Sequence, residues 1–226
     1  MRMLVVASIA TLALSSAAFA HEPGDIILRA GVAHAAPDDS SSRIKADGAK
    51  LPGTKATVGN NTQLGLTGTY IVAPHFGIEL LAATPFTHSV KVKGLNALLG
   101  PGFDGRFADV THLPPTLSAQ YFFLDTKSKF QPYAGIGLNY TMFFDEKLSS
   151  RAKGNGFRKL KLEDSWGLAL QLGADYQITD KLFLNAAVWK IDMKTTAKAN
   201  LQGVGKVKVD VDVDPWVYFV GLGYKF

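Results

Sequence analysis

Cysteine is absent from the 226 residues, so no disulfide can stabilise the fold and no thiol can act as a nucleophile. The five histidines include no pair at the H-x-x-x-H spacing of helical zinc sites. His88 precedes Ser89, but adjacent residues of a strand point to opposite faces, which separates a base from a nucleophile. We therefore predict a protein that is not an enzyme and that holds no metal and no cofactor.

Long apolar runs are also lacking. Beyond the first twenty residues, no segment reaches the roughly 18 consecutive apolar residues of a membrane-spanning helix. The start, MRMLVVASIATLALSSAAFA, has a basic residue, an apolar stretch and a final A-x-A, which is typical of a secretory signal peptide. We expect residues 1–20 to be removed, so that residues 21–226 form one exported domain.

The chain does contain period-two alternation, most clearly at its C terminus. From Trp216 onward, every second residue is large and apolar. These residues are Trp216, Tyr218, Val220, Leu222, Tyr224 and Phe226. On a soluble protein such a row would be an adhesive patch, whereas an outer-membrane barrel turns it toward lipid and carries aromatic girdles. The last stretch therefore favours a strand with a lipid-facing side.

Seven more segments show the same alternation. The eight predicted strands are 25–36, 62–72, 76–86, 114–123, 130–144, 165–177, 182–195 and 206–226. Long and short connections alternate between them, as in bacterial barrels with short periplasmic turns and long extracellular loops. The sequence thus predicts an all-β protein, an eight-stranded antiparallel transmembrane β-barrel in the bacterial outer membrane, with both termini periplasmic.

Polar residues fall on the phase opposite the apolar rows. Arg29, Glu79, Gln171 and Asp175 are predicted to form a polar plug in the lower half of the lumen, with Arg29 paired to Glu79 or Asp175. An arginine on the lipid face at mid-membrane would cost about 2–4 kcal/mol, which favours this orientation. A soluble lipocalin-like barrel would reverse the faces, and the long aromatic rows and the signal peptide argue against it.

The upper part of the last strand, KVKVDVDVD, keeps valines on the inward phase and charges on the outward phase. This pattern predicts a strand in water outside the bilayer with an apolar lumen behind it. The candidate channel residues by phase are Leu81, Phe122, Phe143, Trp189, Val211 and Val213. Interior packing without any ligand is the alternative explanation for each of them.

Three prolines lie where the third and fourth strands meet. Pro85 ends the third strand, and Pro114 and Pro115 open the fourth. Because proline lacks the N–H of a ladder bond, it marks an edge, a bulge or a strand end. We predict a lateral opening there, and the alternative is that both strands simply stop.

Five stretches together resemble the outer membrane protein W family across essentially the whole exported chain. They are GIELLAATPFTH, HLPPTLSAQYFF, QPYAGIGLNYTMFFDE, DSWGLALQLGADY and DPWVYFVGLGYKF. The resemblance implies an eight-stranded barrel with a narrow, largely hydrophobic channel, similar to carriers that bring small hydrophobic compounds past lipopolysaccharide, including alkane-uptake relatives. Some members are receptors for phage or bacteriocins.

We therefore expect passive uptake of small hydrophobic molecules through an apolar lumen, with lateral release into the bilayer. The alternatives are a structural or receptor barrel and a narrow ion channel. Expected partners are outer-membrane lipid, lipopolysaccharide and small hydrophobic solutes. Lipopolysaccharide phosphates are expected because cations gather in the long connections and the formal net charge is +5. The terminal Phe226 is expected to be recognised by the barrel-assembly machinery. An exported barrel meets no nucleic acid.

Overall fold

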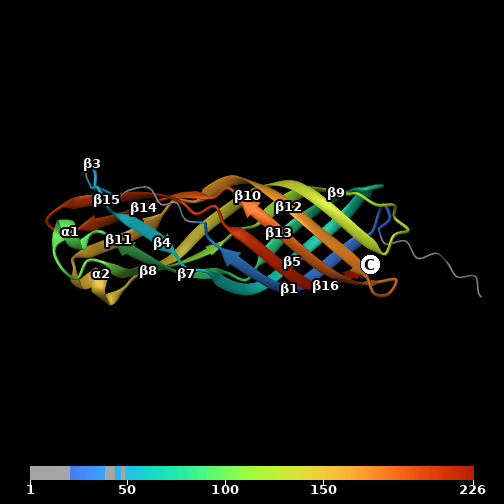
Figure 1. Ribbon diagram of the computed structural model, residues 1–226, viewed down its shortest axis with the longest axis horizontal. Coiled ribbons are helices and arrows are strands. Elements are labelled where there is room, and N and C mark those ends of the chain that lie inside the picture. The colour runs from blue at the N-terminus through green and yellow to red at the C-terminus, as the bar shows by residue number, and fades with distance from the viewer. Residues whose placement is uncertain (1–20, 39–43, 47–48) are drawn as a thin grey trace, which may run out of the picture.

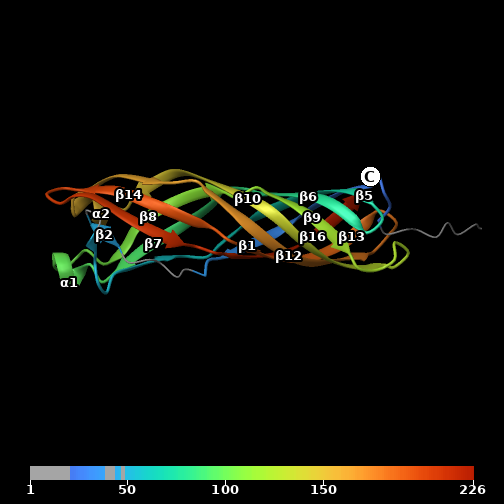
Figure 2. The same cartoon turned by 90° about the horizontal axis from the view of Figure 1, so that it is seen from above.

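The computed structural model describes residues 21–38, 44–46 and 49–226. The described chain is an elongated assembly of strands that run obliquely about one long axis (Figures 1 and 2). Residues 1–20, the predicted signal peptide, lie outside the described residues. In the described ranges, no helix has both the length and the apolarity needed to cross a membrane.

Eight antiparallel strands close into a ring, which confirms the predicted barrel. In order around the ring they are β1 (Ile26–Ala36), β5 (Asn61–Ala73), β6 (Phe76–Ala83), β9 (Thr116–Phe122), β10 (Phe130–Leu148), β12 (Ser165–Gln177), β13 (Leu182–Ile191) and β16 (Trp216–Lys225). The pairing of β10 with β12 closes the ring. The N–H of Phe226 donates to the carbonyl of Ile26 at 2.9 Å, so β16 ends beside the start of β1. We term this the terminal end and the opposite one the far end.

The two faces of the ring differ as the alternation requires. Leu172 and Val220 on the outside are 61% and 58% exposed, whereas the inward Arg29 and Trp189 are buried. Aromatic residues flank the apolar band. Toward the far end, the rings of Tyr140 and Trp166 lie 4.5 Å apart, and at the terminal end those of Tyr224 and Phe226 lie 4.9 Å apart. An apolar band between aromatic girdles is the exterior of a barrel in lipid.

Shorter strands extend the wall beyond the ring. The part of β10 nearest the far end, from Met142 to Leu148, pairs with β8 (Gly105–Leu113). Next to β8 come β7 (Phe86–Lys93) and then β4 (Lys55–Val58). A second sheet has the order β11 (Phe157–Leu162), β14 (Lys194–Leu201), β15 (Gly205–Asp212), β2 (Lys45–Ala46) and β3 (Ala49–Lys50). Two short helices, α1 (Asn96–Leu99) and α2 (Ser150–Gly154), lie at the far end (Figure 1).

These extensions differ from the expected loops. The segments 91–112 and 145–164 carry most of β8 and all of β11, because their inward side chains pack into a common apolar cluster. The predicted seventh and eighth strands are each divided in two, as β13 with β14 and β15 with β16. The far half is therefore a walled structure and not a set of open loops.

Candidate functional site

The far half encloses an apolar chamber of about 370 Å³. Strands β4, β7 and β8 contribute to its wall, and so do β11, β14 and β15. The lining side chains are aliphatic or aromatic apart from Met193 and three polar residues, His88, His112 and Thr195. Small-molecule sites are typically apolar and measure about 300–1,000 Å³. The chamber has the size and the chemistry of a site for a small hydrophobic ligand.

Strand β15 shows how the sequence builds this wall. Val207, Val209 and Val211 line the chamber, while Lys206 and Lys208 are exposed on the other face. β15 pairs with β14, whose Ala197 and Ala199 also line the chamber. Alternating valine and charge thus separates an apolar inside from a charged outside along β15.

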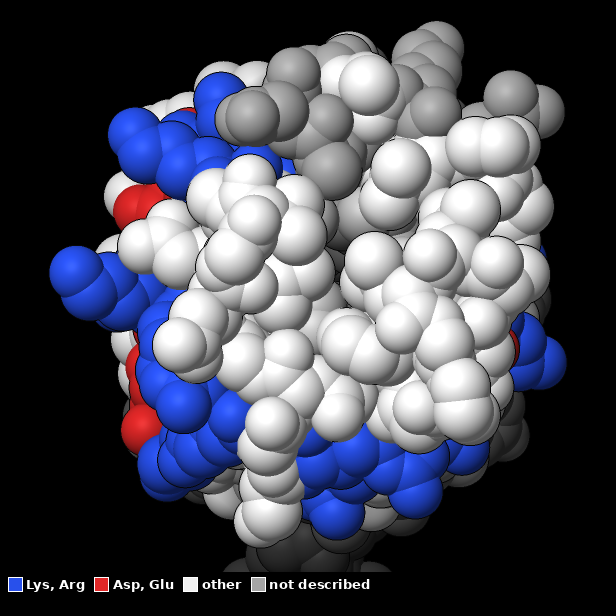
Figure 3. Space-filling model, turned by 90° about the vertical axis from the view of Figure 1, so that its left-hand side faces the viewer, with Lys and Arg blue, Asp and Glu red and all other residues white. Residues whose placement is uncertain are grey.

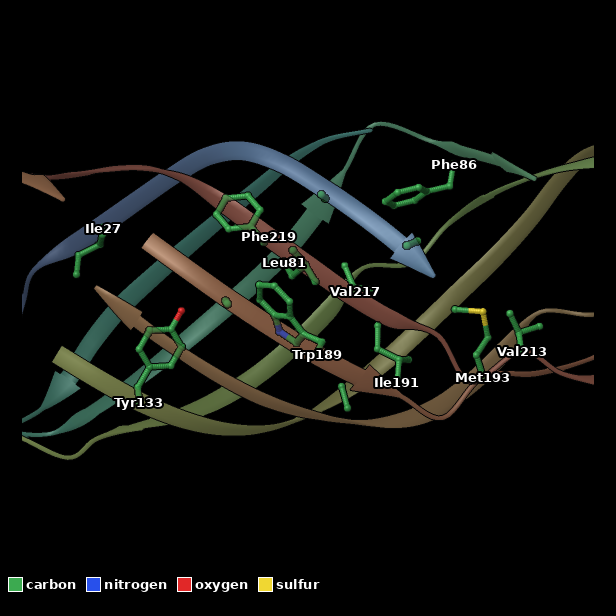
Figure 4. Close-up of a cluster of buried hydrophobic side chains, with 14 of the residues drawn as sticks. Ile27, Leu81, Phe86, Tyr133, Trp189, Ile191, Met193, Val213, Val217 and Phe219 are labelled. Carbon is green, nitrogen blue, oxygen red and sulfur yellow. The ribbon is translucent and has the colours of Figure 1, made fainter. Parts of the chain in front are cut away.

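The six predicted channel residues divide into two groups. Phe143, Val211 and Val213 line the chamber. Leu81, Phe122 and Trp189 are buried deeper, within the ring. Trp189 packs edge-on against Phe219 with ring centroids 6.3 Å apart. Figure 4 shows this packed column running from Ile27 past Trp189 to Met193 and Val213.

The four predicted plug residues form one hydrogen-bonded cluster inside the ring. Nε of Arg29 donates to Oδ1 of Asp175 at 2.9 Å, and Nη2 bonds to the second carboxylate oxygen. Nη1 lies 3.4 Å from Oε2 of Glu79, and Nε2 of Gln171 donates to Oε1 of Glu79 at 2.8 Å. His21 closes the cluster with Nε2 3.1 Å from Oδ2 of Asp175. Arg29 therefore contacts both acids that the sequence offered as alternatives.

The three prolines border an interruption of the wall. The ladder between β6 and β9 ends at Leu81 and Thr116, and pairing resumes between β7 and β8 at Phe86 and His112. Pro85 is exposed, Pro114 is buried and Pro115 is half-buried. The amide of Asn139 donates to the carbonyls of Pro114 and Pro115, each at 3.2 Å. The break coincides with the prolines, and a lateral opening stays a prediction.

Sequence reasoning missed the polar residues on the chamber floor. His88 on β7 and His112 on β8 stack with ring centroids 4.9 Å apart. The ring of Phe86 stacks on that of His112 at 5.6 Å, and Phe143 lies 5.6 Å from His112 on another side. The alternation of side chains could have identified these two histidines. His88 shares one face of its strand with Phe86 and Val90, and His112 shares one face of the next strand with Ala108 and Val110.

Charge gathers at the rim of the far end. Viewed along the axis, uncharged residues fill the middle of this face, and Lys and Arg cluster along its left and lower edges (Figure 3). Lys153, Lys159 and Lys206 are exposed there. Some cations have acidic partners, such as Lys161, whose Nζ lies 3.1 Å from Oε2 of Glu146.

The profile of the OmpW family matches residues 22–226. The chain belongs to the OmpW family. Outer membrane protein W of Vibrio cholerae serotype O1 is 44% identical over 215 residues, which cover 95% of this chain and 94% of that protein. The crystal structure of OprG from Pseudomonas aeruginosa superposes with a TM-score of 0.87 at 56% identity, covering 91% of this chain and 97% of that one. The chain is thus an OmpW-family β-barrel of the outer membrane.

Another relative is more distant in sequence. The dibenzothiophene metabolism operon protein PahQ of Pseudomonas aeruginosa is 26% identical over 188 residues, which cover 83% of this chain and 82% of that protein.

Proposed function

We propose that this OmpW-family barrel is a passive outer-membrane channel that takes up small hydrophobic molecules through the apolar chamber and releases them sideways into the bilayer. The observation that carries the proposal is the position of the chamber: it lies above a ring whose interior is filled by side chains. Along the axis, a molecule held in the chamber meets the buried Trp189, Phe219 and Arg29 cluster, which disfavours passage straight through the ring. It leaves through the wall.

The orientation follows from the same arrangement. The terminal end, with its tight turns and Phe226, faces the periplasm, and the far end faces the outside. The exposed cations at the far rim then meet the phosphates of lipopolysaccharide. Residues 1–20 act as the signal peptide, and the domain is 21–226. The wall break at Pro85, Pro114 and Pro115 is the exit, because it lies beside His112, which lines the chamber and pairs with Phe86 just past the break.

An ion-channel function is less consistent with the interior. Eight-stranded barrels leave a lumen that side chains can fill. Here Arg29 and Asp175 form an ion pair across it, and both side chains are at most 1% exposed. The PahQ name, in contrast, associates one relative with an operon for the metabolism of dibenzothiophene, an apolar aromatic compound.

The test is uptake by cells with and without the protein of a homologous series of hydrophobic compounds, alongside polar solutes of equal size. Val211→Asp places a charge in the chamber wall, and the matched control is Asp212→Asn on the next residue of β15. We expect Val211→Asp to abolish the protein-dependent uptake of hydrophobic compounds and Asp212→Asn to preserve it. Unchanged uptake by folded Val211→Asp protein would contradict the proposal.

A further inference from the structure

The stacked histidines interrupt an otherwise apolar lining. His88 and His112 are 4% and 6% exposed, and their ring planes meet at only 12°. The remaining polar lining residue, Thr195, donates its hydroxyl to the carbonyl of Glu163 at 2.6 Å. Thr195 has thus committed its only hydrogen, and among the lining side chains only the imidazoles can offer a ligand a donor as well as an acceptor. In apolar sites, a few such groups fix the orientation of the ligand.

The backbone fixes the tautomer of His88. Its Nδ1 bonds to the carbonyl of Gly59, and because a carbonyl only accepts, Nδ1 carries the hydrogen. Burial lowers the pKa of His88, so the ring is neutral at pH 7. A neutral ring with hydrogen on Nδ1 has a free lone pair on Nε2. His88 thus offers an acceptor to the chamber.

His112 has the complementary arrangement. Burial, followed by the nearby His88, lowers the pKa of His112 to about 3, so this ring is also neutral. Its Nδ1 is buried and has no partner among the described residues. A buried N–H without an acceptor is rarer than an acceptor without a donor, which favours hydrogen on Nε2. His112 thus offers a donor beside the acceptor of His88.

The two groups do not satisfy each other. In nearly parallel stacked rings, an N–H lies in its own ring plane and does not point at the neighbouring ring. A bound metal ion is also a poor explanation, because the described residues include no group of three His, Cys, Asp or Glu side chains placed to hold one. A donor and an acceptor on two stacked rings that line an apolar cavity match a group that can both donate and accept.

We propose that His88 and His112 form a head-group subsite for the neutral hydroxyl of an otherwise apolar alcohol or phenol. The hydroxyl donates to Nε2 of His88 and accepts from the N–H of His112, while the carbon tail occupies the chamber. A hydrocarbon leaves both nitrogens unsatisfied, and a carboxylate brings an unpaired charge into the cavity; both bind less well. This inference rests on the proposed uptake function and adds a substrate class to it.

The first experiment observes the subsite directly. Protein labelled with ¹⁵N-histidine is placed in lipid nanodiscs and titrated separately with decane, decan-1-ol and decanoate at pH 7. We expect decan-1-ol to shift the imidazole ¹⁵N resonances of His88 and His112, whereas decane and decanoate leave them in place. If the resonances of the two rings do not respond to decan-1-ol, the subsite proposal is overturned. This experiment uses the wild-type protein and requires no variant.

The second experiment separates the subsite from the channel. His88→Phe and His112→Phe keep a flat ring in the stack with Phe86 but remove the nitrogens. His34→Phe, on the outward phase of β1, is the matched control. We expect protein-dependent uptake of decan-1-ol to fall about tenfold in either chamber variant, the factor for one hydrogen bond of ordinary strength, while uptake of decane changes less than about twofold.

The outcomes distinguish the two proposals. If the wild-type protein takes up both compounds and the chamber variants reduce neither, or reduce both equally, the subsite is overturned and the channel stands. If the wild-type protein increases the uptake of neither compound, the channel proposal itself fails, and the subsite fails with it.

Discussion

Arg29 on β1 and Asp175 on β12 form a two-point ion pair across the interior of the ring, although two other strands, β16 and β13, separate them in the wall. Asn185 and His21 also bond to the Asp175 carboxylate. The cluster therefore links β1, β6, β12 and β13 across the lumen through buried hydrogen bonds.

Arg29→Leu should strongly destabilise the barrel. Removing one partner of a buried pair leaves charge without compensation and costs about 3–5 kcal/mol. Here two carboxylates, those of Asp175 and Glu79, lose their cation. The double variant Arg29→Leu/Asp175→Leu should lose less stability than the sum of the two single variants. Urea unfolding in lipid vesicles measures the effect, and additive losses would contradict the coupling.

An ion pair on the surface provides the control for the Arg29 and Asp175 variants. Lys147 and Asp145 lie 2.7 Å apart but are 68% and 52% exposed. Exposed pairs contribute little, because water already solvates both charges. Lys147→Leu should therefore leave the unfolding transition near that of the wild-type protein.

The sequence allowed the ring and its two faces to be predicted because the period of two is unbroken there. Arg29, Glu79, Gln171 and Asp175 share the inward phase, and the pleat alone brings them into one lumen. The partners within the cluster could not be predicted in full, since strand order and stagger decide which inward residues lie at one height.

The chamber was harder to predict because local irregularities break the period. The pairing of β7 with β8 shifts register between Val90 and Lys91, and glycines with positive φ, such as Gly94 and Gly102, interrupt the segment between the strands. The charges of 91–112 and 145–164 then suggested solvated loops. The inward valines of β15 were the exception, since Val207 to Val213 alternate without a shift.

Asp214 should stabilise the backbone at the junction between the ring and the chamber. It has a positive φ of 35°, and its Oδ1 accepts from the N–H of Met193 at 2.9 Å. Asp214→Ala removes that acceptor and places a less tolerant residue in the strained conformation, so we expect a loss of about 1–2 kcal/mol in unfolding free energy. Asp214→Asn keeps an oxygen and tolerates positive φ, and it should remain close to the wild-type stability. Equal losses in both variants would contradict this role.

The prolines at the wall break should affect release. Replacing Pro85, Pro114 and Pro115 with alanine restores three backbone donors next to the unpaired stretch. If these donors close the wall, hydrophobic uptake should fall severalfold while polar solutes are unaffected. Pro74→Ala, in the tight turn at the terminal end, is the control. Unchanged uptake by well-assembled triple variant would favour the simpler interpretation, in which both strands merely stop.

Phe226 should matter for assembly more than for stability. Its ring is 67% exposed and packs on Tyr224 at the terminal end, so little buried area is lost in Phe226→Ala. If the assembly machinery recognises the terminal aromatic residue, as we predict, the amount of protein assembled in the outer membrane of cells should fall severalfold. The same variant, purified and refolded in lipid vesicles, should unfold at nearly the wild-type urea concentration. If Phe226→Ala lowers both the assembled amount and the urea concentration of unfolding, the effect belongs to the fold, which would contradict a recognition role. Phe226→Tyr keeps an aromatic ring and should assemble like the wild-type protein.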